Sequence, residues 1–144
     1  MSDTRRAGYR YFQPVTTRWS DNDLYGHVNN VTYYSYFDSV ANHYLIEQGG
    51  LDIHRGAVIG VVASSGCTYL SPVAYPQPLE AGLRVDRLGN SSVTWGIAVF
   101  ADGADQASAH GSFVHVFVDR ESGRPVPIPA PIRDALERIL VPAG

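Results

Sequence analysis

The sequence predicts an α+β domain in which an antiparallel sheet curls round one long helix. Two observations indicate this fold class. One apolar helical pattern covers residues 31–48 and is too hydrophobic to lie on a protein surface, and nearly all of the chain after it has strand character. The 144 residues, 44% of them hydrophobic, are the size of one domain with a real core. A curled sheet of about five strands is the simplest way to bury such a helix.

The first expected element is a strand at residues 9–19, where Pro14 indicates a sheet edge or a bulge. Residues 1–8 before it are polar, and we expect them to be flexible. The predicted single domain therefore covers residues 9–144.

The long helix is predicted from the spacing of its apolar residues. They recur every three or four positions and define one wide helical face. The residues of that face are Tyr33, Tyr36, Phe37, Val40, Ala41, Tyr44 and Leu45. Asn29 or Asn30 is the expected N-cap, and Gly49 with Gly50 is the expected C-terminal stop.

Four strands are expected after the helix, separated by Gly-, Pro- and Asn-containing turns. Their ranges are 58–70, 79–88, 93–100 and 108–118. The first and last exceed the usual five or six residues, as wrapping a full-length helix requires. A short helix opened by Pro131 is predicted at residues 129–140.

Composition narrows the function classes. Only 17% of the residues are charged, which favours an oligomer, because more surface has to be hidden. The net charge is −3 with no run of Lys or Arg, which argues against nucleic-acid binding. Cys67 is the single cysteine, so an intrachain disulfide is impossible and a reducing cytoplasm is expected. No apolar segment has the length of a signal-peptide core at the start or of a membrane span anywhere.

A dense polar cluster lies between the first strand and the long helix. Residues 21–30 include aspartates, asparagines, a glycine and a histidine. A helix start presents unpaired N–H groups and partial positive charge, which stabilise a developing oxyanion. A carboxylate beside it can attack a carbonyl carbon or deprotonate water. This pattern predicts a carbonyl-polarising site that needs no metal.

Residues 21–33 read D-N-D-L-Y-G-H-V-N-N-V-T-Y. This run resembles the signature of the hotdog-fold acyl thioesterases, in the branch of the 4-hydroxybenzoyl-CoA thioesterases and their acyl-CoA and acyl-carrier-protein relatives. The order of elements over residues 9–120 agrees with that fold. The matching positions are Asp21, Asp23, Gly26, His27, Asn29, Asn30 and Tyr34. Segments 69–73 and 82–86 are also similar to the family.

The resemblance implies hydrolysis of an acyl-CoA or acyl-carrier-protein thioester, with coenzyme A as part of the substrate and no cofactor or metal. Asp23 would be the catalytic carboxylate, as nucleophile or general base. The backbone amide at Asn30 would be the oxyanion donor. His27 and Asn29 would shape the loop or orient water.

The resemblance also implies a homodimer or a dimer of dimers, with the site at a subunit interface. Ser64 and Ser65, in the middle of the next strand, are candidates for the wall that a partner supplies. Tyr25 departs from the family pattern, in which a smaller residue is common, and we expect it to narrow or cover the acyl pocket.

Each of these residues also has a purely structural interpretation. Asp23 can cap a turn, and the asparagines are good helix caps. Asp21 fits better as a structural partner of Arg18. His27 is interpreted equally well as a hydrogen-bonded loop residue or as an acid or base.

Other chemistries find no support in the sequence. A calcium loop starting at Asp21 needs an oxygen ligand at its fifth position and Glu at its twelfth, but Tyr25 and Thr32 stand there. The five histidines lack zinc-site spacing, and no G-x-S-x-G elbow is present. Cys67 fits a buried small hydrophobe better than a nucleophile.

Two further functions on the same fold stay open. A hotdog enoyl-thioester hydratase uses an Asp and a His at a short spacing, usually with a proline between them, and that proline is absent here. A non-catalytic acyl-thioester binding module would keep the pocket and lose the carboxylate, whereas Asp23 is present.

Overall fold

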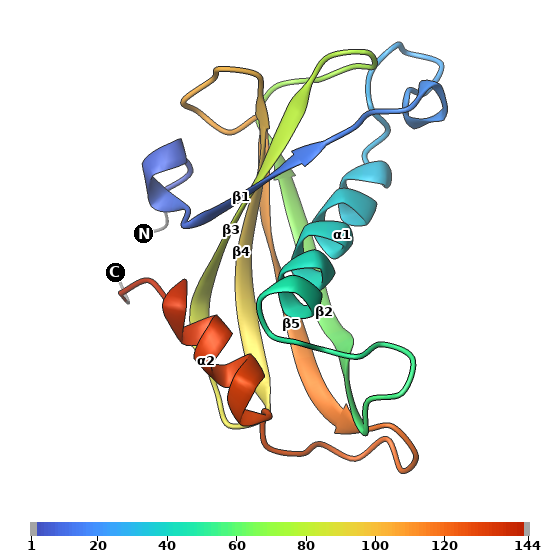
Figure 1. The fold of residues 1–144 in the computed structure, drawn as a ribbon. Coiled ribbons are helices and arrows are strands. Elements are labelled where there is room, and N and C mark those ends of the chain that lie inside the picture. The colour runs from blue at the N-terminus through green and yellow to red at the C-terminus, as the bar shows by residue number, and fades with distance from the viewer. Residues whose placement is uncertain (1–2, 143–144) are drawn as a thin grey trace.

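A five-stranded antiparallel sheet curls round one long helix in the computed structural model, which describes residues 3–142 (Figure 1). The strands lie in the order β1-β3-β4-β5-β2. Their bounds are β1 (Tyr11–Val15), β2 (Val58–Tyr69), β3 (Leu79–Leu88), β4 (Ser92–Ala101) and β5 (Ala109–Asp119). The long helix is α1 (Thr32–Glu47), and a shorter one, α2 (Ala130–Arg138), follows the sheet. The predicted fold class is confirmed.

The face of α1 that the sequence predicts is the face that the sheet covers. All seven of its apolar residues are buried, and Phe37, Ala41 and Leu45 are fully so. They belong to one core with the inward-facing side chains of the sheet, including Leu83, Val85, Trp95, Ile97, Phe113 and Phe117. Burying each large side chain contributes about 1.5–3 kcal/mol, so this face fixes where α1 lies.

The end of α1 follows the two glycines. The N–H groups of Gly49 and Leu51 both donate to the Leu45 carbonyl, at 3.1 and 3.0 Å. Gly50 lies between them with φ +70°, a left-handed conformation that glycine adopts without steric cost.

The first strand is shorter than predicted. β1 covers only five residues, and the chain leaves the sheet after Val15 to form a short 3-10 turn, η2 (Trp19–Asp21). The predicted strand at residues 9–19 was therefore too long at both ends. Pro14 does pair with β3 from the sheet edge, as its missing N–H requires.

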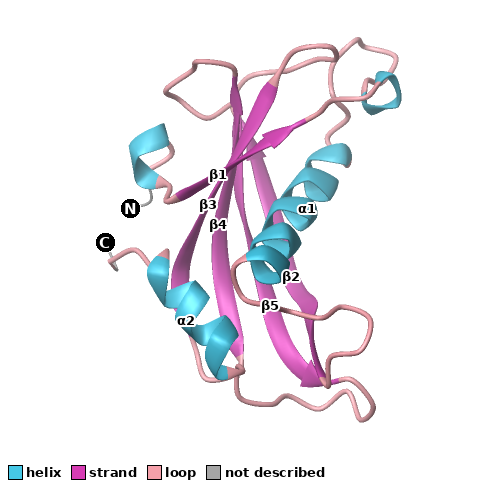
Figure 2. Cartoon of the chain, in the orientation of Figure 1, coloured by secondary structure: helices cyan, strands magenta, loops and turns pink. Residues whose placement is uncertain are grey.

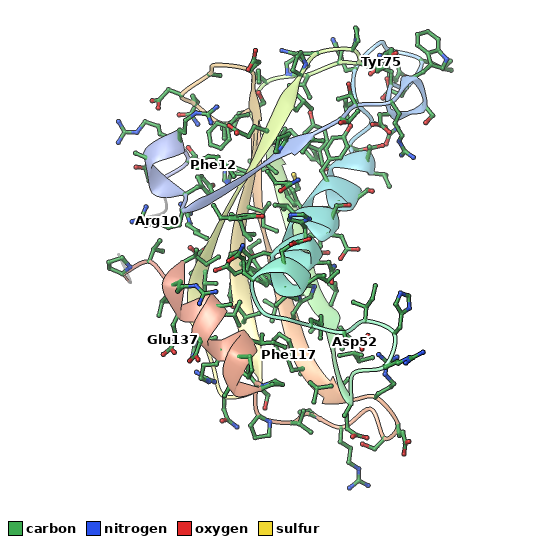
Figure 3. The ribbon with its side chains drawn as sticks, in the orientation of Figure 1. Arg10, Phe12, Asp52, Tyr75, Phe117 and Glu137 are labelled. Carbon is green, nitrogen blue, oxygen red and sulfur yellow. The ribbon has the colours of Figure 1, made fainter. Side chains whose placement is uncertain are left out.

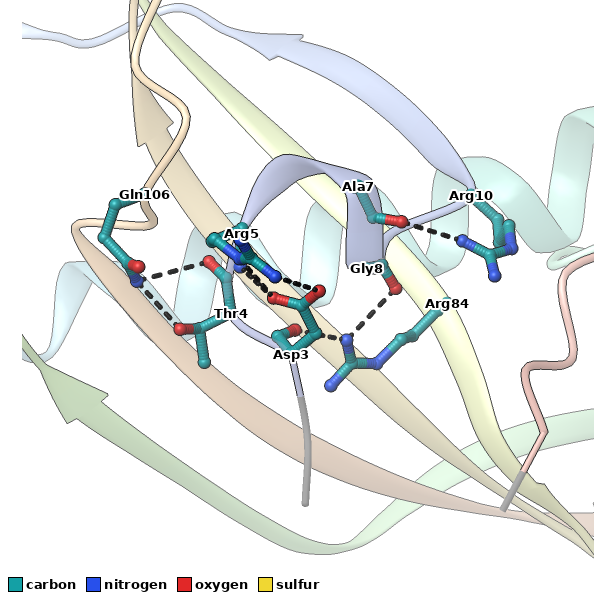
Figure 4. A network of polar contacts seen from close by, with 8 residues as sticks. All are labelled: Asp3, Thr4, Arg5, Ala7, Gly8, Arg10, Arg84 and Gln106. Atoms are coloured by element: carbon teal, nitrogen blue, oxygen red, sulfur yellow. Dashed lines mark hydrogen bonds and ion pairs between the residues drawn. The ribbon is translucent and has the colours of Figure 1, made fainter. Parts of the chain in front are cut away.

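The segment before β1 covers the outer face of the sheet. It contains a 3-10 turn, η1 (Arg6–Gly8), and Arg84 of β3 donates to the carbonyls of Asp3 and Gly8 (Figure 4). The Arg6 guanidinium lies 4.8 Å from the centre of the Phe100 ring and pairs with Glu80. These contacts tie residues 3–8 to the sheet. The flexibility expected of residues 1–8 stays a prediction, and residues 1–2 lie outside the described residues.

Helix α2 lies beside the C-terminal end of α1 (Figure 2). Ile132, Ala135 and Leu136 are buried, and the Tyr44 hydroxyl of α1 donates to the Ala135 carbonyl. The short C-terminal helix is therefore confirmed. Neither helix described over residues 3–142 has the length and hydropathy of a membrane span.

Candidate active site

The polar cluster forms a loop that leads from η2 to the start of α1, and Asp21 holds its beginning. The Asp21 side chain is 1% exposed. Its Oδ2 accepts hydrogen bonds from the Tyr36 hydroxyl at 2.7 Å and the Arg18 N–H at 2.9 Å, while Oδ1 accepts from the Arg18 guanidinium. The Asp21 carbonyl also accepts from the Asn29 N–H. The structural role expected for Asp21 and its pairing with Arg18 are present.

The environment of Asp21 keeps its carboxyl ionised. Burial by itself raises the pKa of this group, but the hydrogen bonds from Tyr36 and Arg18 and the positive charge of Arg18 outweigh it. The net result is a pKa below that of an ordinary aspartate.

A second segment, residues 69–75, packs along the loop and is tied to it at two backbone positions. The Val28 N–H donates to the Val73 carbonyl at 2.8 Å, and the Tyr75 N–H donates to Asn22 Oδ1 at 2.9 Å. Figure 3 shows Tyr75 at the end of the molecule where α1 begins. This segment continues directly from β2, so its hydrogen bonds attach the polar loop to the sheet.

Asp23 begins a tight turn. Its Oδ1 accepts from the Tyr25 N–H at 2.9 Å, and its carbonyl accepts from the Gly26 N–H at 3.1 Å. Gly26 has φ +83°, which a residue with a side chain rarely adopts. The turn-capping interpretation of Asp23 is thus correct for one oxygen. The other, Oδ2, accepts no hydrogen bond from residues 3–142.

The start of α1 differs from the prediction in one respect. Neither asparagine is the N-cap; Val31 holds that position, and the side-chain oxygens of Asn29 and Asn30 both accept from the Val31 N–H, at 2.9 and 3.0 Å. The Asn29 carbonyl accepts from the Thr32 N–H at 2.9 Å. The two asparagines therefore build the turn that precedes the helix rather than its first cap.

The Asn30 N–H is the open amide at this helix start. Within residues 3–142 it donates to no acceptor, whereas the N–H groups of Asn29, Val31 and Thr32 all do. An open amide in front of a helix carries part of the positive end of the helix dipole, so it favours an anion.

One cleft of about 370 Å³ brings the main site candidates together. Asp23, His27 and Asn30 line it from the loop. Its opposite wall comes from Tyr33 of α1 and from Tyr69, Leu70, Ser71 and Pro72. Asp23, which has a free carboxylate oxygen, and Asn30, which has an open amide, therefore line the same cleft. A carboxylate and an open helix-start amide are the groups needed to attack and polarise a carbonyl group.

Four predicted site residues lie outside this cleft. Ser64 and Ser65 are exposed on β2, an edge strand of the sheet, and Tyr25 is 87% exposed at the tip of the Asp23 turn. Asn29 does not line the cleft either and acts through the backbone of the turn. The substrate-binding roles of Ser64, Ser65 and Tyr25 stay predictions, since they depend on a second chain.

The wall formed by residues 69–72 is the part of the site that sequence reasoning missed. The similarity of segment 69–73 to the family was a signal, but nothing in the sequence places its Tyr69 and Ser71 hydroxyls beside the polar loop. Its proximity to the loop arises from pairing of β2 with β5 and from the Leu70 and Ser71 N–H groups, which both donate to the Ser108 carbonyl.

Cys67 lies two residues before Tyr69 on β2 and is partly buried. Burial raises the pKa of its thiol, which disfavours the thiolate needed of a nucleophile. Among residues 3–142, no three His, Cys, Asp or Glu side chains cluster closely enough to hold a metal ion.

Comparison with known proteins agrees with this geometry. The model of the thioesterase-like superfamily matches residues 17–136. The chain belongs to that superfamily. The match includes the loop, α1, the rest of the sheet and most of α2, so both walls of the cleft lie within it.

Solved structures similar to this thioesterase-like chain share its fold. Protein PA5185 of Pseudomonas aeruginosa strain PAO1 is 59% identical, with a TM-score of 0.95 and coverage of 97% of this chain and 98% of that one. A thioesterase of Thermus thermophilus, solved in complex with coenzyme A and zinc, is 31% identical, with a TM-score of 0.74 and coverage of 89% and 98%. YsmA of Bacillus subtilis strain 168, an uncharacterised protein, is 30% identical over 122 residues, 84% of this chain and 81% of YsmA.

Proposed function

We propose that this protein hydrolyses an acyl thioester, of coenzyme A or of an acyl carrier protein, to a carboxylic acid and a thiol. One observation carries the proposal: Asp23, with a free carboxylate oxygen, and Asn30, with an open amide, line one cleft at the start of α1. Membership of the thioesterase-like superfamily supports the reaction class, and the coenzyme A bound by the Thermus relative supports the thiol half of the substrate.

The reaction follows from these two groups. The thioester oxygen accepts a hydrogen bond from the Asn30 N–H, which stabilises the negative charge that develops there. Asp23 either takes a proton from water, which attacks the carbonyl carbon, or attacks that carbon itself to form an anhydride that water then opens. A C–O bond forms, the C–S bond breaks and the sulfur leaves as thiolate. A thiol pKa of about 8.5 makes this leaving group a good one without an acid to protonate it.

His27 lines the same cleft and is exposed, which supports a role in orienting the attacking water. Asn29 supports the amide indirectly, through the turn that its side chain and carbonyl stabilise.

A second copy of the chain is part of the proposal. The cleft is shared between the loop and the end of β2, and β2 is an edge strand whose middle, including Ser64 and Ser65, is exposed. Unpaired strand edges are sites where another strand adds. A homodimer, or a dimer of dimers, would let the partner complete the wall of the acyl pocket and bring Tyr25 against the substrate. A cytoplasmic location remains a prediction from the single cysteine.

The test is thiol release from a panel of short, long and aromatic acyl-CoAs. We expect the wild type to release thiol and free acid in equal amounts, and Asp23→Asn to lower kcat by on the order of 10²–10⁴-fold. The matched control is Asp52→Asn, because Asp52 also caps a turn through its Oδ1, with the N–H groups of His54 and Arg55, but lines no part of the cleft.

Nearly intact turnover by Asp23→Asn would refute the role of Asp23. Hydration of a crotonyl thioester without thiol release would instead identify a hydratase, and tight acyl-CoA binding without any turnover would identify a binding module.

A further inference from the structure

Tyr69, the last residue of β2, makes a contact that the reaction above does not use. Its hydroxyl donates to the Asn30 carbonyl at 2.9 Å. Its ring packs edge-on against the Tyr33 ring, with centroids 5.1 Å apart and an interplanar angle of 78°. Tyr33 is 3% exposed in α1, so the Tyr69 ring is supported by the core while its hydroxyl reaches the loop.

The contact is made to the peptide group next to the open amide. The Asn30 N–H belongs to the Asn29–Asn30 peptide group, whose carbonyl accepts from the Thr32 N–H. Because N–H and C=O of a trans peptide point in opposite directions, this bond turns the Asn30 N–H away from the helix. The next peptide group, Asn30–Val31, is held on its N–H side by the two asparagine side chains and on its carbonyl side by Tyr69.

Tyr69 differs from these other contacts in its origin. The asparagine and Thr32 bonds are local, within four residues of one another, and can shift together with the exposed turn. Tyr69 is 39 positions away in sequence and stands on a strand with a long ladder to β5. The Tyr69 bond therefore connects the Asn30 backbone directly to the sheet.

The hydroxyl is suited to permanent donation. Although Tyr69 is 42% exposed, the partial loss of hydration around its hydroxyl and the neighbouring Cys67 raise its pKa above that of a free phenol. The proton therefore stays on the oxygen over the whole pH range in which a thioester substrate is stable enough to assay.

We propose that Tyr69 is a positioning residue of the hydrolysis: its bond to the Asn30 carbonyl fixes the Asn30–Val31 peptide group, and through Asn30 it steadies the open N–H so that this group points to where the thioester oxygen would lie. This inference rests on the proposed function. It assigns to the end of β2 a role in stabilising the developing oxyanion, in addition to lining the cleft.

The test is Tyr69→Phe, which removes the hydroxyl and keeps the ring on Tyr33. We expect kcat to fall about tenfold, the scale of one neutral hydrogen bond, with KM for the acyl-CoA unchanged and the melting temperature nearly so. Amide hydrogen exchange of residues 29–33 should become faster, while exchange elsewhere stays the same. The matched control is Tyr11→Phe, which removes a tyrosine hydroxyl on β1 whose one hydrogen bond within residues 3–142 is to Gln13. All four readouts should stay at wild-type values.

Two results overturn the inference while leaving the proposed function intact: an unchanged kcat in Tyr69→Phe, whatever the exchange rates, or a loss expressed entirely in KM, which would make Tyr69 a binding wall only. Asp23→Asn, assayed in parallel, separates these from failure of the function itself. If the wild type and Asp23→Asn release thiol equally slowly, the hydrolysis and the positioning role fall together.

Discussion

Asp21 and Asp23 stand two positions apart in one loop and occupy opposite environments. Asp21 is buried, and both of its oxygens accept hydrogen bonds from Arg18 or Tyr36. Asp23 is partly exposed and lines a cleft; one of its oxygens accepts from the Tyr25 N–H, and the other accepts no hydrogen bond from residues 3–142. The difference teaches that the sequence motif combines a carboxylate that builds the loop with a carboxylate that is left free to react.

The structural carboxylate sets the position of the reactive one. The Asp21 carbonyl accepts from the Asn29 N–H, so the same residue that binds Tyr36 of α1 also closes the loop at its far end. Asp23 and Asn30 then belong to a loop whose beginning and end are joined by the Asp21–Asn29 hydrogen bond, and both line the cleft.

The largest expected effect on stability comes from Asp21→Ala. It removes a buried acceptor of charge-assisted hydrogen bonds and leaves the Tyr36 hydroxyl unpaired, so the free energy of unfolding should fall by about 3 kcal/mol. Asp23→Asn should change it by less than about 0.5 kcal/mol, as expected of a substitution outside the core. Urea unfolding of both variants measures the contrast, and equal losses would remove the distinction between the two residues.

A smaller loss is expected for Tyr36→Phe, which deletes only the hydroxyl that donates to Asp21. One hydrogen bond to a charged group is worth about 1.5–3 kcal/mol, and here Arg18 remains to satisfy the carboxylate, so the lower end applies. In a double-mutant cycle with Asp21→Ala the two losses should not add, because they remove the same contact. Additive losses would show that Tyr36 stabilises the helix independently of the loop.

Acid should lower the free energy of unfolding through Asp21, because protonation removes the charge that its hydrogen bonds stabilise. The folded pKa of Asp21 lies below that of an unfolded aspartate, about 3.9, so its contribution is fully present above that pH and is lost as pH falls through the folded pKa. In Asp21→Asn, which has no carboxyl to protonate, that part of the acid-induced loss should be missing from a series of urea midpoints between about pH 3 and 7. If the urea midpoints of Asp21→Asn fell with decreasing pH as steeply as those of the wild type, another group would be responsible for the loss of stability in acid.

The core contains a second group, His115, whose protonation changes stability with pH, and its effect must be distinguished from that of Asp21. His115 is 1% exposed, and its Nδ1 accepts from the Trp95 indole N–H at 2.9 Å, which requires that nitrogen to be unprotonated. Burial lowers the pKa of His115, although the carboxylate of Asp38 opposes this.

Because the unfolded chain binds the proton more readily, the stability that neutral His115 provides is present above about pH 6.5 and is lost as pH falls from there towards the folded pKa. His115→Gln keeps an acceptor for Trp95, and its urea midpoint should vary less over that window than the midpoint of the wild type. This is the smallest effect expected, and a midpoint with wild-type pH dependence would contradict it.

The sequence was most informative where periodicity is strong. The buried face of α1 and the four later strands follow from repeats of three to four and of two residues. The start of α1 was placed too early, because the asparagine side chains bind the Val31 N–H and make a turn before the helix. β1 was predicted too long, because nothing local in residues 16–19 marks where the chain leaves the sheet.

The site was predictable to the extent that it is local. Asp23, His27 and Asn30 share one loop, and they line one cleft. Tyr69 could not be assigned a role from the sequence, since its contact with Asn30 depends on how β2 is registered against β5. Ser64, Ser65 and Tyr25 depend on a second chain, which one sequence and one fold do not specify.

The kcat of Asp23→Asn for a reactive acyl-CoA, set against the kcat of Asp52→Asn, is the most direct measurement of the central idea. If a free carboxylate beside an open helix-start amide splits the thioester, the first variant loses on the order of 10²–10⁴-fold and the second keeps wild-type turnover. Equal turnover by the two variants would contradict the account.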